Sequence, residues 1–89
     1  MNVSIIIVNF NTKQLLLNCI DSIYTHTKDI SFEIIVSDNA STDGSVEMVK
    51  TQFPNVILIE NKMNLGFGAA NNKALKIAKG KYIFYLNSD

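Results

Sequence analysis

The hydrophobic positions of this chain fall into four short runs, separated by stretches in which apolar residues recur at helical spacing. The first run, over residues 3–11, is rich in β-branched side chains, and only Ser4 interrupts it before Asn9. A strand that is apolar on both faces is typical of the interior of a parallel sheet, because crossover helices cover both sides. The pattern therefore predicts a central strand whose carboxyl end presents Asn9 and Asn11.

Three further strands are predicted at residues 32–36, 56–59 and 82–86, each followed by polar or turn-forming residues. Apolar residues three and four apart predict helices over about residues 13–24, 44–52 and 69–79. Pro54 and Gly80 would end the second and third of these helices. Residues 25–31 and 60–64 are expected to be loops, and residues 65–68 a flexible turn.

Strands that alternate with helical crossovers require parallel pairing and right-handed connections. We therefore expect an α/β fold with a doubly wound, Rossmann-like and mostly parallel sheet, strand order 3-2-1-4 and helices on both faces. The switch point would lie between the first and fourth strands, and ligands of such sheets bind beyond the carboxyl ends of the strands. This topology gathers Asn9, Asn11, Asp38 and Asp89 around one crevice.

Length and charge limit the possibilities further. A chain of 89 residues allows one domain, residues 1–89, around a small core. The formal net charge is +0 and the lysines cluster only loosely, so no nucleic-acid partner is expected.

Cys19 is the single cysteine, which excludes an internal disulfide, and we expect it to be a thiol in the hydrophobic core. Without a signal peptide or an apolar run of about 20 residues, we expect a cytoplasmic chain, with a peripheral membrane location of the full-length protein as the alternative.

The crevice lacks the usual phosphate-binding loops. The turn after the first strand reads Asn-Phe-Asn-Thr where a dinucleotide fingerprint would be glycine-rich, and no Walker loop occurs. If phosphate is bound, a divalent cation held by a carboxylate could bind it in place of a glycine-rich loop. Mg²⁺ and Mn²⁺ prefer oxygen ligands, and substrate phosphates complete their coordination. Asp89, at the end of the fourth strand, would supply such a carboxylate.

Two aspartates precede the second helix, and they favour different roles. Asp38 ends a strand inside a polar turn, and acceptance of a hydrogen bond from a base or ribose is as well supported as a structural turn role. Asp43 lies beside a predicted helix start, where unpaired amides and the helix dipole stabilise a carboxylate. A structural role is therefore favoured for Asp43.

The third helix begins in a segment whose composition suits an anion. Gly66 and Gly68 flank Phe67 just before the predicted helix, where exposed backbone amides can bind an anionic ligand. A plain turn from loop to helix explains the two glycines equally well. Asn71 and Asn72 follow in the first turn, where asparagine is a mediocre helix former, and together they slightly favour binding.

Four segments, taken in order, resemble the amino-terminal nucleotide-binding half of family 2 glycosyltransferases with the GT-A fold. They read Ile-Val-Asn-Phe-Asn, Val-Ser-Asp-Asn-Ala-Ser-Thr-Asp-Gly-Ser, Asn-Leu-Gly-Phe-Gly-Ala-Ala-Asn-Asn and Tyr-Leu-Asn-Ser-Asp. The resemblance covers the whole chain and implies a truncated GT-A domain. It also implies transfer of a sugar from a nucleotide diphosphate sugar donor with inversion, assisted by Mg²⁺ or Mn²⁺.

The resemblance also implies roles for individual residues. The end of the first strand would line the nucleotide, Asp38 would contact the base, and the segment from Asn64 to Asn72 would close over the nucleotide and pyrophosphate. Asn87-Ser88-Asp89 resembles the metal motif usually written Asp-x-Asp, with Asp89 at the metal and Asn87 toward the ribose. Asparagine in its first position, familiar from rhamnosyltransferase-like members, removes one charge. The implied donor-binding residues are Val8, Asn9, Asn11, Asp38, Asn64, Gly66, Asn71 and Asn87.

No catalytic residue is assigned within this sequence. Members of the family continue past the metal motif into strands that form the acceptor site and supply an Asp or Glu base. The acceptor, a saccharide or a lipid-linked molecule, therefore stays open, and we expect the chain alone to be inactive. We also expect it to self-associate, because the apolar strand at residues 82–86 would form an unpaired edge.

Two other classes of protein share this pattern. A receiver-like signalling domain is also a small doubly wound sheet, but the paired acidic cluster that would hold its magnesium after the first strand is missing. A non-catalytic nucleotide-binding or assembly module is the other alternative. A carboxylate base in the continuing reading frame would distinguish an enzyme from such a module.

Overall fold

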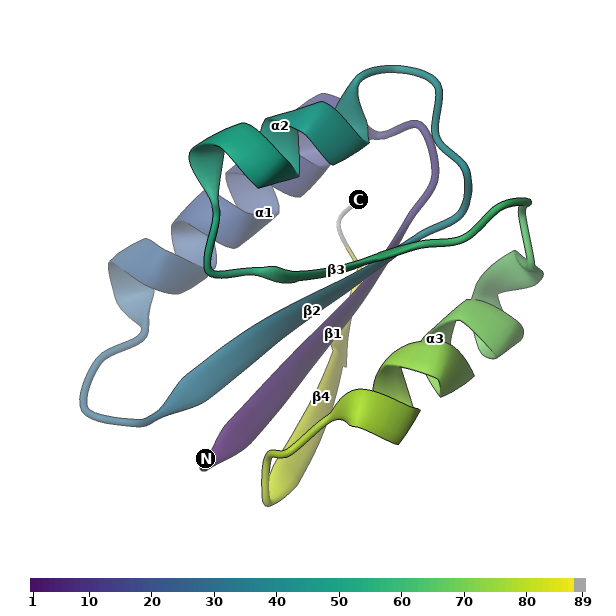
Figure 1. Ribbon diagram of the computed structural model, residues 1–89. Coiled ribbons are helices and arrows are strands. Elements are labelled where there is room, and N and C mark those ends of the chain that lie inside the picture. Colours follow the sequence, from purple (N-terminus) through teal and green to yellow (C-terminus); the bar gives the residue numbers. More distant parts are fainter. Residues whose placement is uncertain (88–89) are drawn as a thin grey trace.

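The computed structural model, described here for residues 1–87, contains a parallel sheet with helices on both faces (Figure 1). The strand order is β3-β2-β1-β4, as predicted, and each neighbouring pair is parallel. In chain order the elements are β1 (Val3–Asn9), α1 (Lys13–His26), β2 (Phe32–Asp38), α2 (Ser45–Gln52), β3 (Ile57–Glu60), α3 (Gly66–Ile77) and β4 (Tyr82–Leu86).

Strand β1 lies in the interior of the sheet, between β2 and β4. Its register runs from Val3 opposite Phe32 to Asn9 opposite Asp38, and on the other side from Val3 opposite Tyr82. Six of its seven residues are buried. The long β-branched run is therefore the central strand, and its register places Asn9 beside Asp38 at the carboxyl ends.

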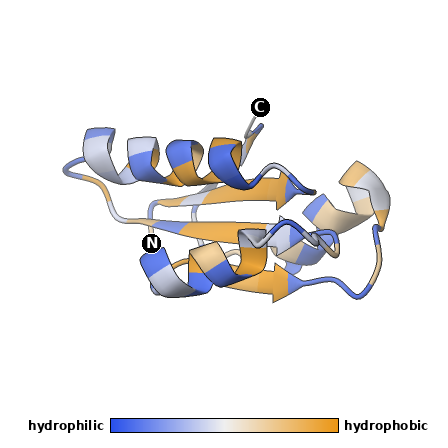
Figure 2. Ribbon diagram, turned by 90° about the horizontal axis from the view of Figure 1, so that it is seen from above, coloured by the Kyte–Doolittle hydropathy of each residue, from blue (hydrophilic) through white to orange (hydrophobic). Residues whose placement is uncertain are grey.

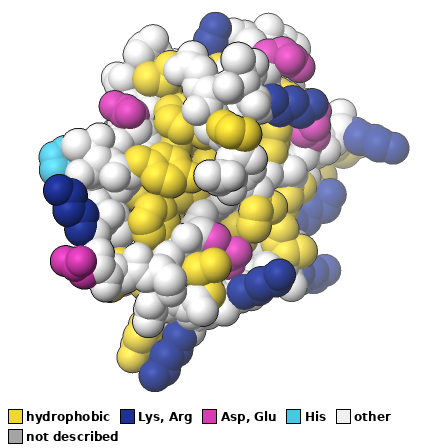
Figure 3. All heavy atoms as spheres, turned by 60° about the vertical axis from the view of Figure 1, so that its left-hand side comes forward, with side chains coloured by type: hydrophobic (Ala, Val, Ile, Leu, Met, Phe, Trp, Pro, Cys, Tyr) yellow, Lys and Arg dark blue, Asp and Glu magenta, His cyan; other side chains and the backbone are white. Residues whose placement is uncertain are grey.

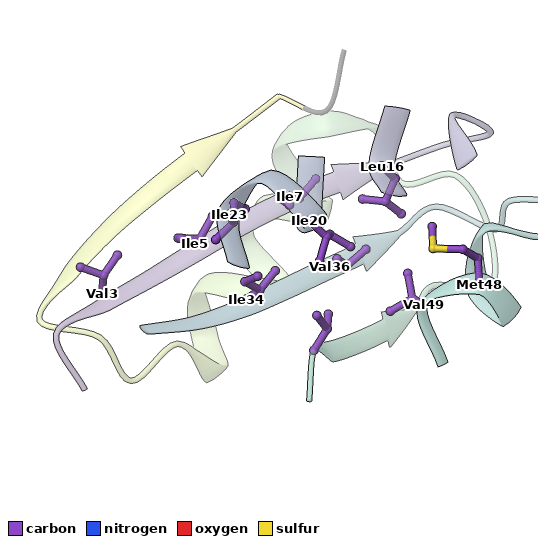
Figure 4. Close-up of a cluster of buried hydrophobic side chains, with 11 residues drawn as sticks. Val3, Ile5, Ile7, Leu16, Ile20, Ile23, Ile34, Val36, Met48 and Val49 are labelled. Carbon is purple, nitrogen blue, oxygen red and sulfur yellow. The ribbon is translucent and has the colours of Figure 1, made fainter. Parts of the chain in front are cut away.

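Alternate residues of the strands face two separate cores. Helices α1 and α2 cover one face, α3 covers the other, and the apolar strands lie between them (Figures 1 and 2). Figure 4 shows the larger core, in which strand side chains from β1 and β2 point toward Leu16 and Ile20 of α1. Cys19 packs against this core, and burial raises the pKa of its thiol. The smaller core joins Ile6, Ile35 and Ala74.

The predicted element boundaries were wrong at several places. Strand β2 extends to Asp38, and α3 ends at Ile77, before the Gly80 that was expected to end it. Helix α3 begins at Gly66 rather than residue 69, so the expected flexible turn already belongs to the helix. The Asn64 side-chain oxygen accepts from the Gly66 N–H (2.8 Å), which occupies one of the amides that a helix start leaves unpaired. Helix α1 continues to His26, and β3 is shifted by one residue because Glu60 pairs with Asp38.

Side-chain hydrogen bonds connect the strands at the amino-terminal end of the sheet. The Glu33 carboxylate accepts from the Ser4 hydroxyl and from the Lys79 N–H, both at 2.6 Å. The Gly80 N–H donates to the same Ser4 hydroxyl at 2.7 Å. Ser4, the polar interruption in the central run, thereby connects β1, β2 and the turn into β4.

Hydrophobic side chains also reach the surface. Figure 3 turns the left-hand side of Figure 1 forward and shows hydrophobic side chains gathered between charged ones. On the edge strand β4, the exposed fraction is 60% for Tyr82 and 59% for Phe84. This edge is the expected site of self-association, which stays a prediction.

Among residues 1–87, no helix combines the length and the apolar character that crossing a membrane requires.

We predict that Gly80→Ala destabilises the protein. A Cβ at Gly80 would clash with the Ser4 backbone nitrogen and lie 2.6 Å from the Val3 carbonyl carbon. Two backbone segments would have to separate, and such overpacking lowers the free energy of unfolding by roughly 1–3 kcal/mol. Urea denaturation measures this change.

Gly68→Ala is the matched control for this prediction. Its Cβ would meet nothing within 4 Å, and Gly68 lies in α3. Alanine is favoured over glycine in helices by up to about 1 kcal/mol, so no loss of stability is expected. Equal destabilisation by both substitutions would contradict the proposed clash at Gly80.

Candidate functional site

The carboxyl ends of β1 and β2 are joined by buried polar side chains. The Asn9 amide donates to Asp38 Oδ1 (2.8 Å), and the Thr12 hydroxyl donates to Asn9 Oδ1 (2.7 Å). Asp38 also accepts from the Ser41 hydroxyl (2.7 Å) and the Ser41 N–H (2.9 Å). Asn9 and Asp38 are each 1% exposed. Both Asp38 oxygens therefore serve internal hydrogen bonds.

The loops that follow these two strands are also tied to each other. The Asn11 side-chain oxygen accepts from the Thr42 N–H (2.7 Å), while the Asn11 N–H donates to the Ser41 hydroxyl (2.9 Å). Asn11 and Ala40 have φ values of 51° and 59°, in the left-handed region. Asparagine tolerates that region, whereas alanine is strained there.

Asp43 binds the amino-terminal ends of two helices at once. One carboxylate oxygen accepts from the Lys13 N–H of α1 (2.9 Å), and the other accepts from the Ser45 N–H of α2 (3.0 Å). Burial acts to raise the pKa of Asp43, but hydrogen bonds from the Ser45 hydroxyl and from these backbone amides outweigh it and leave the pKa below its ordinary value. The structural role favoured for Asp43 is thus confirmed.

A hollow of about 330 Å³ opens beyond the carboxyl ends of β1 and β4, at the predicted switch point. Pockets of about 300–1,000 Å³ with a few convergent polar groups are typical ligand sites. Its lining combines amide side chains and two exposed aromatic rings, without a charged side chain among the described residues. The lining residues are Val8, Phe10, Thr12, Asn39, Asn64, Gly66, Phe67 and Asn87.

The structure separates the predicted site residues into two groups. Val8, Asn64, Gly66 and Asn87 line the hollow. The other four do not belong to the described lining: Asn9 and Asp38 are buried and bonded to each other, Asn11 bonds the loop after β2, and Asn71 is buried in α3. Asp89 lies outside the described residues. Contact of Asp38 with a nucleobase and of Asp89 with a metal stay predictions.

Residue alternation explains why Asp38 lies beneath the site. Successive strand residues point to opposite faces, so Asp38 continues the row of Ile34 and Val36 toward α1 and α2. Val8 continues the row of Ile6 toward α3, where the hollow opens. Asp38 is also only 1% exposed, which leaves it poorly accessible to a phosphoryl donor and disfavours a receiver-like phosphorylation site at this residue.

Four lining residues were not named individually from the sequence, although Phe67 lies in the segment 64–72 that was expected to close over the nucleotide. They comprise the rings of Phe10 and Phe67, which are 47% and 58% exposed, together with Thr12 and Asn39. The signal for Asn39 was its place one residue after Asp38, on the opposite face of the strand end. A large aromatic residue in each of two polar turns was the signal for the rings.

A larger hollow, of about 620 Å³, lies at the opposite end of the sheet. Tyr24, Ile30, Phe32 and Ile57 give it an apolar lining at the amino-terminal side of β2. Ligands of open α/β sheets bind at the carboxyl ends of the strands, where the polar side chains of this protein converge. The smaller hollow is therefore the candidate site.

The described residues by themselves do not form a metal centre. Within residues 1–87, no group of three His, Cys, Asp or Glu side chains is placed to hold an ion. Asn39, Asn64, Asn87 and Thr12 offer only neutral oxygen atoms to the hollow. Hard divalent cations are held by oxygen ligands that include one or two carboxylates, so the described lining alone does not fit a resident cation.

The polar hollow at the switch point of a parallel sheet defines a ligand-binding domain of the doubly wound α/β class. The sequence matches the family described as glycosyl transferase family 2 over residues 4–89, and the chain belongs to that family. A curated relative, poly(ribitol-phosphate) beta-glucosyltransferase of Bacillus spizizenii, is 40% identical over 94 residues. That alignment covers 100% of this chain and 15% of the relative.

Solved structures show the same fold. S. aureus TarS in complex with UDP superposes with a TM-score of 0.90 at 27% identity, over 100% of this chain and 28% of that one. The mannosyltransferase PcManGT from Pyrobaculum calidifontis, in complex with GDP-Man and Mn²⁺, superposes with a TM-score of 0.88 at 29% identity. It is covered to 27%, and this chain to 99%. The sheet is thus that of GT-A glycosyltransferases, and the chain spans 15% to 28% of the length of these three proteins.

We predict that Asp43 makes the stability of the fold depend on pH in the acidic range. A carboxyl whose pKa is lower in the folded than in the unfolded state stabilises the fold above its unfolded pKa, about 4, and this contribution is lost as pH falls through the folded pKa. Asp43→Asn should therefore lower the melting temperature at pH 6, with a smaller loss near pH 3. A difference that does not change with pH would contradict the hydrogen-bonded carboxylate.

Proposed function

We propose that this chain forms the donor-binding part of an enzyme that moves a sugar from a nucleotide diphosphate sugar to an acceptor hydroxyl. The observation that carries the proposal is the neutral, amide-rich hollow beyond β1 and β4, in a chain of glycosyl transferase family 2. Relatives solved with UDP or with GDP-Man and Mn²⁺ support a nucleotide ligand.

Each part of the hollow suits one part of such a donor. The exposed rings of Phe10 and Phe67 offer apolar surfaces on which a flat nucleobase can stack. The amides of Asn39, Asn64 and Asn87 both donate and accept, which matches the mixed groups of a base and a ribose. The amino-terminal end of α3 borders the hollow at Gly66, where helix amides and the helix dipole favour phosphate.

The proposal includes a divalent cation, Mg²⁺ or Mn²⁺, bound by Asp89 and the donor diphosphate. Such an ion would neutralise the charge that develops on the leaving diphosphate. The amide at position 87 leaves Asp89 as the only carboxylate of the last three residues of the sequence. Mn²⁺ in PcManGT and in the mycobacterial glucosyl-3-phosphoglycerate synthase supports the use of a cation.

The reaction would proceed with inversion and with a catalytic base from another part of the protein. An in-line displacement by a hydroxyl needs a general base on the acceptor side, for which the family resemblance implies an Asp or Glu, and the described lining contains no such group. Inactivity of the chain alone follows from this proposal. The acceptor, a saccharide or lipid-linked hydroxyl, and the cytoplasmic location remain predictions.

We predict that Phe67→Ala weakens nucleotide binding in the full-length protein. Stacking of a base on an aromatic ring contributes on the order of 1–3 kcal/mol, so the dissociation constant of UDP, GDP or dTDP should rise roughly five-fold or more. Isothermal titration calorimetry measures this change. Leu75→Ala is the matched control, because Leu75 is a similarly exposed apolar residue of α3 outside the described lining. Equal effects of the two substitutions would contradict stacking at Phe67.

We predict that Asp89→Asn abolishes the stimulation of sugar transfer by Mn²⁺ or Mg²⁺ in the full-length enzyme. The amide keeps the shape of the side chain but removes the charge that holds the cation. Transfer assays over a series of metal concentrations measure the effect, and circular dichroism checks the fold. Full activity that still requires the cation would assign its binding to another residue.

A further inference from the structure

A buried asparagine lies behind the candidate site without touching it. Asn61 follows β3, is 4% exposed, and its backbone N–H donates to the Asp38 carbonyl (2.9 Å). Its side-chain amide donates to the Ser37 hydroxyl and to Asn39 Oδ1, each at 3.0 Å. The described lining of the hollow includes Asn39 but not Asn61.

Asn39 in turn hydrogen-bonds to the start of α3. It is 2% exposed, and its backbone N–H donates to the Asn9 carbonyl (2.9 Å). Its side-chain oxygen accepts from the Leu65 N–H (3.4 Å), while its amide donates to the Gly66 carbonyl (3.2 Å). One side chain thus holds backbone groups of two successive residues, Leu65 and Gly66, at the point where α3 begins.

The first turn of α3 has little else to fix its position. Residues 66–69 are exposed, so few packing contacts hold them against the sheet. Gly66 has a φ of 79°, and the residue before the helix, Leu65, offers no side-chain oxygen to cap it. Asn64 caps only the Gly66 N–H. Among residues 1–87, the hydrogen bonds from Asn39 therefore connect this turn to the ends of the strands.

The Asn61 side chain is not optimal for stability alone. Its Oδ1 is buried and has no hydrogen-bond partner among the described residues. Buried polar atoms without partners are rare, because burial removes them from water without compensation. A role in holding Asn39 accounts for an amide at this position where an apolar residue would avoid the unpaired oxygen.

We propose that Asn61 and Asn39 act as a positioning pair for the donor: Asn61 orients Asn39, and Asn39 holds the turn that carries Gly66 and Phe67 at the hollow. This inference rests on the proposed function. Among the described lining residues, Asn61 hydrogen-bonds only to Asn39, so its effect on a nucleotide would be transmitted through Asn39.

The test compares Asn61→Asp with a core substitution in the full-length protein. Aspartate keeps the shape of Asn61 but has no N–H to donate to Asn39 Oδ1. We expect a roughly ten-fold higher dissociation constant for UDP, GDP or dTDP in MnCl₂, and roughly ten-fold faster hydrogen exchange in segment 64–72 without nucleotide. Ile20→Val, in the core on the opposite face, should lower the melting temperature while changing neither quantity.

Asn18→Asp is the second control, because it makes the same chemical change at an exposed position of α1 and should leave both readouts unchanged. Unchanged exchange in segment 64–72 of Asn61→Asp would overturn the positioning pair, as would an equal loss of affinity in Ile20→Val. If the wild-type protein binds none of the three nucleotides, the proposed function fails, and the exchange result alone then decides whether Asn61 holds the turn.

Discussion

The structure depends on the burial of β1 on both faces. This strand pairs with β2 along its whole length and with β4 on its other side, and each of its two rows of side chains enters a different core. Helices are therefore required on both faces, and the crossovers that supply them make the sheet parallel. Parallel pairing brings the carboxyl ends of β1, β2 and β4 to one edge, so the position of the site follows from the position of one strand.

The polar groups at that edge form two levels. The lower level is a set of side chains that bond to one another: Asn9 and Ser41 both donate to Asp38, and each Asp38 oxygen accepts at least one of these hydrogen bonds. The upper level offers neutral amides and aromatic rings to the hollow. A ligand that carries its own charge would meet uncharged donors and acceptors, and its charge would have to be compensated by the helix end and a cation.

Much of this arrangement could be predicted from the sequence, and the failures have identifiable physical causes. Apolar runs and helical spacing predicted the strand order and both helical layers, because burial patterns are recorded directly in residue type. The start of α3 was missed because two glycines have low helix propensity, whereas the Asn64 cap and the contacts from Asn39 overcome it.

The orientation of side chains at the strand ends was not worked out from the sequence. Asp38 was weighed evenly between a ligand contact and a structural turn role, and strict alternation puts its side chain on the face toward α1 and α2. The same rule would have selected Asn39. The buried pairing of Asn39 with Asn61 could not be predicted, because it joins residues 22 positions apart and leaves no local pattern.

The left-handed conformation of Ala40 has a consequence for the entropy of ligand binding. Because the backbone turns sharply at Ala40, the side chains on either side of it reach different elements. Asn39 hydrogen-bonds to the start of α3, while Ser41 hydrogen-bonds to the turn after β1. Both walls of the hollow are thereby tied to one short segment before any ligand arrives. Association with a small molecule would then need little ordering of the chain, so the entropy lost on binding would fall mainly on the ligand.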